Sequence, residues 1–97
     1  MKREDFVFTI GYQGSTAMVD RTARKQYGSL GTDELFREGL HRAAFCSALY
    51  SGDEAELQVF SERFGAVSGL GPVSVDRLKR LFGVTTVPDN VNRVMLV

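Results

Sequence analysis

The sequence has a single cysteine, a single histidine and no tryptophan among its 97 residues. The lone Cys46 cannot form a disulfide within the chain, which favours a reducing, cytoplasmic setting. One cysteine and one histidine are too few for a zinc site of the usual ligand spacing. His41 and Cys46 are five positions apart, whereas neighbours on a helix are three or four apart, so we expect no cysteine–histidine nucleophile pair. Cys46 is expected to be a small buried thiol.

The sequence also lacks a long apolar run and a net charge. No stretch of 18 apolar residues is present, which argues against a membrane-spanning helix and a membrane partner. The start of the chain does not have the pattern of a signal peptide, so we expect a cytoplasmic protein. Twelve Lys and Arg residues balance 12 Asp and Glu residues, which argues against a strongly basic nucleic-acid binder.

The charges are nevertheless unevenly distributed along the chain. Residues 33–62 contain seven acidic and two basic residues, a balance of −5, whereas residues 63–97 contain five basic and two acidic residues, a balance of +3. The potential over the last third of the chain is therefore expected to be positive, although the total charge is zero.

Signatures of enzymes and of common phosphate-binding loops are missing. Gly11–Gly14 has the form GxxG, but its interior residues, Tyr12 and Gln13, are not basic, so it does not match a KH loop. No Lys follows the glycines, which excludes a P-loop. The seven phenylalanines are spaced as core residues, not as a platform on which bases stack. We therefore expect no catalytic residue, no metal site and no cofactor.

The sequence predicts a single α+β domain over residues 1–97. Phe6–Ile10 is rich in aromatic and β-branched residues, and it is predicted to form a hairpin with the strand Thr16–Val19. Residues 20–31 are polar and punctuated by glycine, so we expect a loop or an irregular extension. Val91–Val97 is so apolar that it must be covered, and we expect it to complete the sheet by pairing with Phe6–Ile10.

Three to four helices are predicted between these strands, near residues 33–50, 53–64 and 72–82. Thr32 is the expected N-cap of the first of these helices, which Gly39 interrupts. Ser51 and Glu54 have the spacing of a capping box, which would open the helix Asp53–Phe64. On that helix the apolar face is Leu57, Phe60 and Phe64, and the polar face is Glu54, Gln58, Ser61 and Glu62.

The stretch Ala66–Gly83 is the most informative part of the chain. Gly69 and Gly71 flank Leu70, and Pro72 suits the first turn of a helix because its missing N–H would have had no partner there. The following residues repeat at helical spacing and end at Gly83, where a left-handed cap is expected. The apolar face of this second helix is predicted to be Val75, Leu78, Leu81 and Phe82.

The apolar residues and glycines of this stretch follow the order apolar-x-Gly-apolar-Gly and then a helix, and they are Val67, Gly69, Leu70, Gly71, Val75, Leu78 and Phe82. The segment 53–83 thereby resembles the helix-hairpin-helix module of DNA repair and recombination proteins. The chain departs from that module at Ser68, where many members have Pro, and at Val73, where Lys or Arg is frequent. Only one copy is visible, whereas many members carry two.

The resemblance implies that backbone N–H groups of the hairpin and the N-terminus of the second helix hold a phosphate without reading sequence. The nucleic-acid-binding residues implied in this way are Gly69, Leu70, Gly71, Val73, Ser74, Arg77, Lys79 and Arg80.

Two functions remain open for the sequence. One is a non-catalytic domain that binds the backbone of DNA or RNA weakly, and the other is a protein-interaction or structural domain whose hairpin is only architectural. An exposed hairpin inside a positive patch would favour the first, and a covered hairpin would favour the second. The sequence makes no prediction of oligomeric state.

Overall fold

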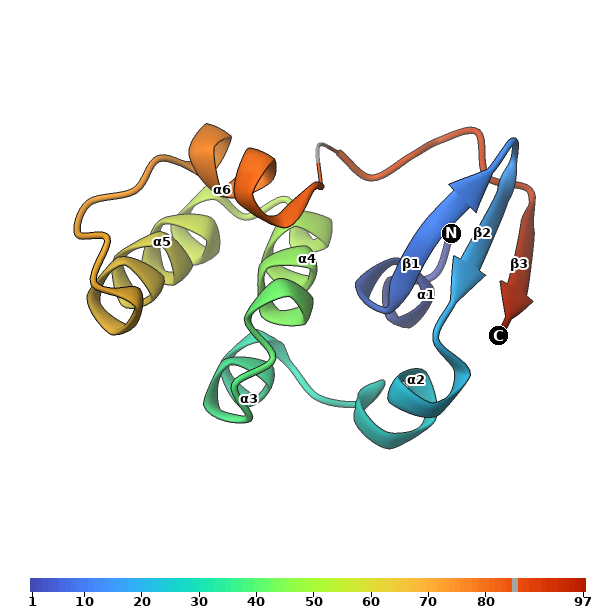
Figure 1. Cartoon of the computed structure of the whole chain (residues 1–97), viewed down its shortest axis with the longest axis horizontal. Coiled ribbons are helices and arrows are strands. Elements are labelled where there is room, and N and C mark those ends of the chain that lie inside the picture. The colour runs from blue at the N-terminus through green and yellow to red at the C-terminus, as the bar shows by residue number, and fades with distance from the viewer. Residues whose placement is uncertain (85) are drawn as a thin grey trace.

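Helix α4 (His41–Ser51) lies between the two halves of the fold, with the sheet on one side and a pair of helices on the other (Figure 1). The computed structural model describes residues 1–84 and 86–97 and has α+β architecture, as the sequence predicts. Within the described residues there are six helices rather than the three or four expected. In chain order the elements are α1 (Arg3–Val7), β1 (Thr9–Gln13), β2 (Thr16–Val19), α2 (Arg21–Tyr27), α3 (Thr32–Arg37), α4, α5 (Glu54–Ser68), α6 (Val75–Phe82) and β3 (Arg93–Leu96).

The N-terminal hairpin is confirmed, but its first strand starts later than predicted. β1 pairs antiparallel with β2, and Gly14 takes the left-handed conformation (φ +61°) that the tight turn requires. The prediction of a strand over Phe6–Ile10 is wrong for its first three residues, because α1 ends at Val7 and β1 begins at Thr9. Phe6 and Val7 belong to α1, and their side chains are buried in the core. This packing overrides the β propensity of the two residues.

The C-terminal strand completes the sheet, but its partner and its burial differ from the prediction. β3 pairs parallel with β2, in the order β1-β2-β3, rather than with residues 6–10. A parallel pair requires a crossover, and here the helices between β2 and β3 provide it (Figure 1). All four residues of β3 are exposed, so the expectation that this apolar segment is covered is also wrong.

Residues 20–31 contain a helix where a loop was predicted. Asp20 is the N-cap of α2, and its carboxylate accepts a hydrogen bond from the Ala23 N–H at 3.1 Å. Arg24 of α2 forms an ion pair with the buried Asp5 at 2.6 Å. α2 is short and its sequence is polar, so hydrophobic periodicity does not reveal it.

The helices α3 and α4 are separated at Gly39, as predicted, which has a positive φ of +77°. The N-cap of α3 is Gly31 rather than Thr32, and the Glu34 carboxylate accepts the Gly31 N–H at 3.3 Å. The hydroxyl of Thr32 instead donates to Ser47 Oγ at 2.7 Å.

The capping box predicted at Ser51 and Glu54 is not formed, because α4 continues through Ser51. The N-cap of α5 is Asp53, whose carboxylate accepts the N–H groups of Ala55 and Glu56. α5 also runs to Ser68, four residues beyond the predicted end at Phe64.

An aromatic cluster forms the core between α4, α5 and α6. Phe45 stacks on Phe82 with ring centroids 5.4 Å apart, and Phe60 stacks on Phe64 at 5.8 Å. The phenylalanines are therefore core residues, as predicted: six are buried and Phe82 is partly buried. Cys46 is buried beside them with 1% of its surface exposed, and this burial raises the pKa of the thiol. Its predicted structural position is confirmed.

Candidate nucleic-acid interface

The connection between α5 and α6 is a tight hairpin made by two left-handed glycines. Gly69 ends α5 with φ +77°, and Gly71 follows with φ +72°. Residues with a Cβ rarely adopt this conformation, so two such positions within three residues explain the Gly-Leu-Gly pattern. Leu70 lies between them at the tip, with 42% of its surface exposed.

The hairpin is held against α5 by a close contact at Gly65. The Gly71 N–H donates to the Gly65 carbonyl at 3.0 Å, and a Cβ at Gly65 would lie well inside contact distance of the Gly71 carbonyl oxygen. Gly65 thus positions the hairpin, although the sequence pattern did not single it out. Only the packing of α5 on the hairpin reveals it, because a glycine within a helix gives no local signal of its purpose.

A second contact fixes the chain just after the hairpin. The Ser61 hydroxyl donates to the Val73 carbonyl oxygen, and both residues are buried. The prediction that Ser61 belongs to the polar face of its helix is therefore wrong: it faces the hairpin. Val73, a predicted nucleic-acid-binding residue, packs into the core, so its side chain does not face a ligand.

The second helix begins at Val75 and not at Pro72 as predicted. Ser74 is its N-cap, and the Ser74 hydroxyl accepts the Arg77 N–H at 3.1 Å. In the described residues, no hydrogen bond joins the N–H groups of Gly69, Val75 and Asp76 to the protein. The N–H groups of Val73 and Ser74 likewise have no described partner, whereas the Gly71 N–H is already used.

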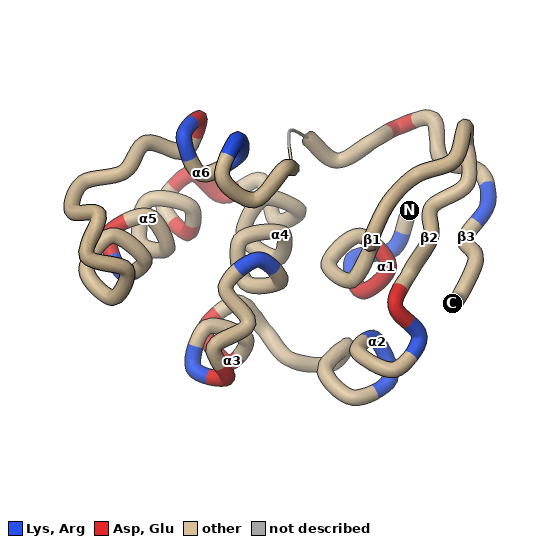
Figure 2. Tube along the Cα trace, viewed as in Figure 1, with Lys and Arg blue, Asp and Glu red and all other residues tan. Residues whose placement is uncertain are grey.

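The basic residues of α6 form no ion pair with any residue that the structure describes. Arg77 and Arg80 are exposed and Lys79 is partly exposed. The four ion pairs found in the part of the chain that the structure describes join other residues, namely Arg24 with Glu4 and Asp5, and Asp33 with Arg37 and Arg63. Figure 2 shows these cations on α6, at the edge of the molecule. The predicted apolar face of α6 is correct except at Leu81, which is 55% exposed.

Acidic groups limit the extent of this positive surface. Asp76 lies in the first turn of α6. Glu62 and Gln58 of α5 line a groove of about 470 Å³ whose other wall includes Gly71 and Val73. The negative charges of Glu62 and Asp76 therefore reduce the positive potential around the hairpin and at the start of α6.

Of the eight predicted site residues, seven are exposed or partly exposed and one is buried. The seven lie on the hairpin, at the N-cap of α6 and on α6 itself, and they are Gly69, Leu70, Gly71, Ser74, Arg77, Lys79 and Arg80. Val73 alone is turned inward.

No protein family, curated protein or solved structure matches this chain. In residues 1–84 and 86–97, no three metal-ligating side chains of His, Cys, Asp or Glu come together as a metal site. The helices in these ranges are also too short or too polar to cross a bilayer. The geometry of the hairpin surface is therefore the basis for a functional assignment.

Proposed function

We propose that the protein binds the phosphate backbone of nucleic acids weakly and without sequence preference. The observation that carries this proposal is the Gly69–Gly71 hairpin, which leads into α6, a helix whose three cations form no ion pair in the described chain.

The N-terminus of α6 supplies the first part of the binding surface. The N–H groups of Ser74, Val75 and Asp76 at this end of the helix are unpaired among the described residues, and N–H groups at a helix N-terminus favour an anion. Because Gly71 donates to Gly65, it shapes the hairpin rather than contacting phosphate.

The side chains of α6 supply the second part. Arg77 and Arg80 are exposed on this helix, and arginine binds phosphate oxygens through two parallel N–H groups. Backbone contacts of this kind carry no sequence information. Asp76 and the zero net charge reduce the attraction, which is why we expect weak binding.

The test is fluorescence anisotropy of labelled duplex and single-stranded DNA at low salt. The wild type is compared with the triple variant Arg77→Gln, Lys79→Gln, Arg80→Gln. The wild type should bind, with affinity falling steeply as salt rises, at a log–log slope of about −3 for three phosphate contacts. The triple variant should lose this binding.

A matched control removes the same amount of charge elsewhere. The substitutions Lys2→Gln, Lys25→Gln and Arg93→Gln alter exposed cations that make no side-chain hydrogen bond or ion pair to a described residue. This control should bind as the wild type does. Equal binding by both triple variants, or no binding by the wild type at high micromolar protein, contradicts the proposal.

A protein-interaction role is the second candidate, and one observation favours it. Val67 and Leu70 are 60% and 42% exposed at the hairpin, and exposed apolar side chains are frequent at interfaces with other proteins. Under this alternative, neither the wild type nor the Leu70→Ser variant binds DNA. The substitution then weakens only the contact with the partner protein.

A further inference from the structure

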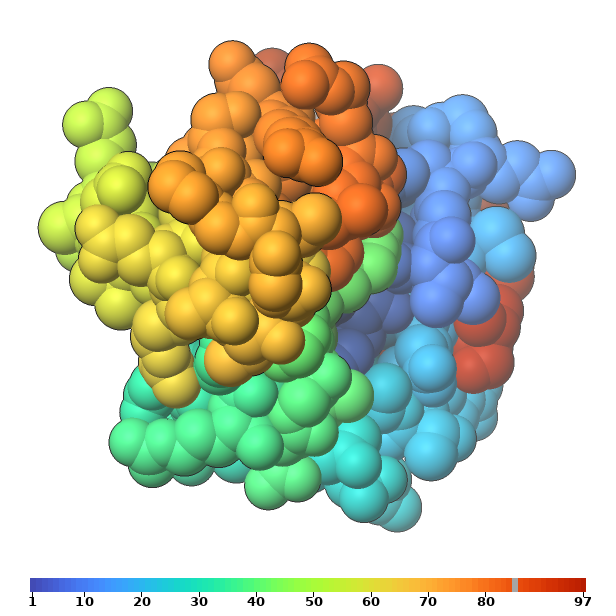
Figure 3. All heavy atoms as spheres, turned by 60° about the vertical axis from the view of Figure 1, so that its left-hand side comes forward, coloured from blue at the N-terminus to red at the C-terminus, as the bar shows by residue number. Residues whose placement is uncertain are grey.

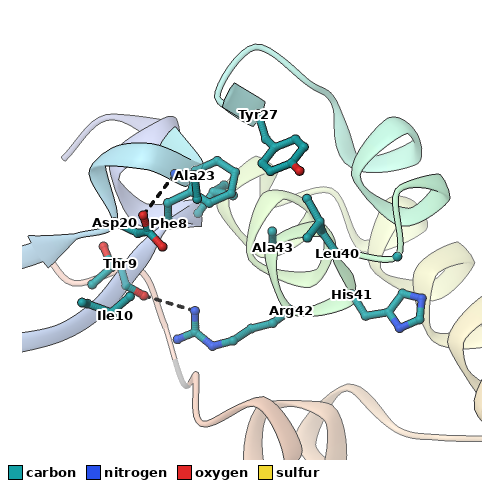
Figure 4. A pocket seen from close by; sticks show the side chains of 12 residues that line it. Phe8, Thr9, Ile10, Asp20, Ala23, Tyr27, Leu40, His41, Arg42 and Ala43 are labelled. Atoms are coloured by element: carbon teal, nitrogen blue, oxygen red, sulfur yellow. Dashed lines mark hydrogen bonds between the residues drawn. The ribbon is translucent and has the colours of Figure 1, made fainter. Parts of the chain in front are cut away.

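A second candidate site lies far from the hairpin, between the N-terminal strands and the start of α4. A cavity of about 460 Å³ opens there, within the range of small-molecule sites. The space-filling view shows the surface hollowed between the green and blue segments (Figure 3). Figure 4 shows the side chains that line it.

The floor of the cavity is apolar. Phe8 and Ala43 are buried, and the partly buried Ala23 and Leu40 pack against the same core. His41 lines the rim, but its ring points away (Figure 4) and packs on Phe36 at 4.9 Å and on Phe64 at 5.4 Å. The floor therefore suits an aliphatic or aromatic group, and the imidazole does not take part.

Two opposite charges face this cavity without neutralising each other. Asp20 comes from the N-terminal end of α2 and Arg42 from α4, and no ion pair joins them in the described structure. Asp20 is partly buried and Arg42 is exposed, so both charged groups can be reached from solvent. Their separation leaves one anionic and one cationic position open to a ligand.

Each group is held in place by some of its atoms and keeps others free. Arg42 donates from Nε to the Phe82 carbonyl at 3.2 Å and from Nη1 to the Thr9 carbonyl at 3.1 Å, while no described residue accepts from Nη2. Asp20 uses Oδ1 to accept the Ala23 N–H, and Oδ2 accepts from no described residue. Both side chains are thus oriented by the fold and still able to bind.

We propose that this cavity binds a small zwitterion with an apolar side chain, of the kind of a free apolar α-amino acid. The carboxylate of the ligand binds Arg42, its ammonium binds Asp20, and its side chain lies on Phe8, Leu40 and Ala43. Tyr27 also lines the cavity, and in Figure 4 its hydroxyl lies near Leu40 and away from Asp20 and Arg42, so this side chain adds to the apolar end of the site. This site is independent of the hairpin surface.

The test is an NMR titration of the ¹⁵N-labelled full chain with L-leucine at millimolar concentration. Two probes that each lack one charge, 4-methylpentanoate and isoamylamine, are titrated in parallel. Leucine should shift the amide resonances of residues that line the cavity. Each single-charge probe should bind with an affinity lower than that of leucine by a factor of about ten or more.

The informative variant is Asp20→Asn, which keeps an oxygen able to cap α2 and removes only the charge. Its matched control is Asp53→Asn, the same change at the exposed N-cap of α5. Asp20→Asn should weaken leucine binding about tenfold and leave 4-methylpentanoate unaffected, and Asp53→Asn should change neither.

A filling variant, Ala23→Leu, should abolish binding while circular dichroism shows that the helices are kept. The proposal is overturned if leucine shifts no cavity resonance, if 4-methylpentanoate binds as tightly as leucine, or if Asp20→Asn binds leucine as the wild type does.

Discussion

At the residue scale, the close contact between Gly65 of α5 and the Gly71 carbonyl determines whether the hairpin, and with it α6, can pack against α5. Alanine within a helix is favoured over glycine by about 1 kcal/mol. A Cβ at Gly65, however, would overlap the Gly71 carbonyl oxygen, which is backbone and cannot rotate away. Because the steric term acts on fixed atoms, it exceeds the gain in helix propensity.

Gly65→Ala should therefore destabilise the protein by about 1–3 kcal/mol, as overpacking does. Urea unfolding followed by circular dichroism measures this change. Gly11→Ala is the control, because an added Cβ at Gly11 meets nothing within 4 Å and φ is not positive there. A stable Gly65→Ala protein would show that the hairpin can move away from α5 at little cost.

The buried thiol of Cys46 gives a second test at this scale. Its pKa is raised by burial, although the Arg42 charge acts in the opposite direction. The folded thiol thus stays protonated in a pH range where an unfolded thiol ionises, so the free energy of unfolding should decrease as pH rises past the ordinary thiol pKa. Below that pH this group should not make stability depend on pH.

Native protein should react slowly with a thiol reagent at neutral pH and rapidly in urea. Fast, stoichiometric labelling of the folded protein would show instead an exposed, activated thiol, in conflict with the 1% exposure of Cys46.

At the scale of elements, the sequence predicts the helices that carry their own signals. α5 and α6 are marked by apolar spacing and α4 by its apolar composition, and Gly39 marks the break before α4. α1 and α2 carry no such signal, since they depend on distant contacts. Arg3 donates to the carbonyls of Gly28 and Leu30 and to Ser47 Oγ, and these partners are at least 25 positions away.

In the candidate site, too, local features can be predicted from the sequence and features that depend on distant contacts cannot. The GLGP pattern predicts the hairpin and its left-handed glycines, which are local properties of the chain. The burial of Val73, the contact with Ser61 and the close approach of Gly65 depend on how α5 packs on the hairpin. No pattern within one helix contains that information.

The Arg24–Asp5 pair between α2 and α1 tests this dependence on distant contacts. Arg24→Ala leaves the carboxylate of Asp5, which is 8% exposed, without its partner and should cost about 1–3 kcal/mol. Arg37→Ala is the control, because both members of its ion pair with Asp33 are at least half exposed and such pairs contribute about 0–1 kcal/mol.

Urea unfolding at low and high salt distinguishes the two variants. The loss from Arg24→Ala should persist in high salt, whereas any loss from Arg37→Ala should be screened. If both variants lost the same free energy of unfolding at each salt concentration, the buried Arg24–Asp5 pair would not be what holds α2 in place.

At the scale of the whole molecule, Arg42 joins the two halves of the fold. Its guanidinium spans from the Thr9 carbonyl at the start of β1 to the Phe82 carbonyl at the end of α6. The same residue lines the cavity between the halves. A ligand that binds Arg42 would therefore stabilise the contact between the sheet and the helix pair, and thermal unfolding in the presence of leucine should shift upward.

The parallel pairing of β2 with β3 has a consequence for folding kinetics. Val19 lies beside Leu96, so this part of the sheet closes a loop that contains every helix except α1. Closing a long loop costs chain entropy before its contacts form, and such non-local pairings slow folding. The β1–β2 hairpin and the helices should thus acquire protection from hydrogen exchange first, and the strand that pairs across the whole chain should be the last to form and the first to open.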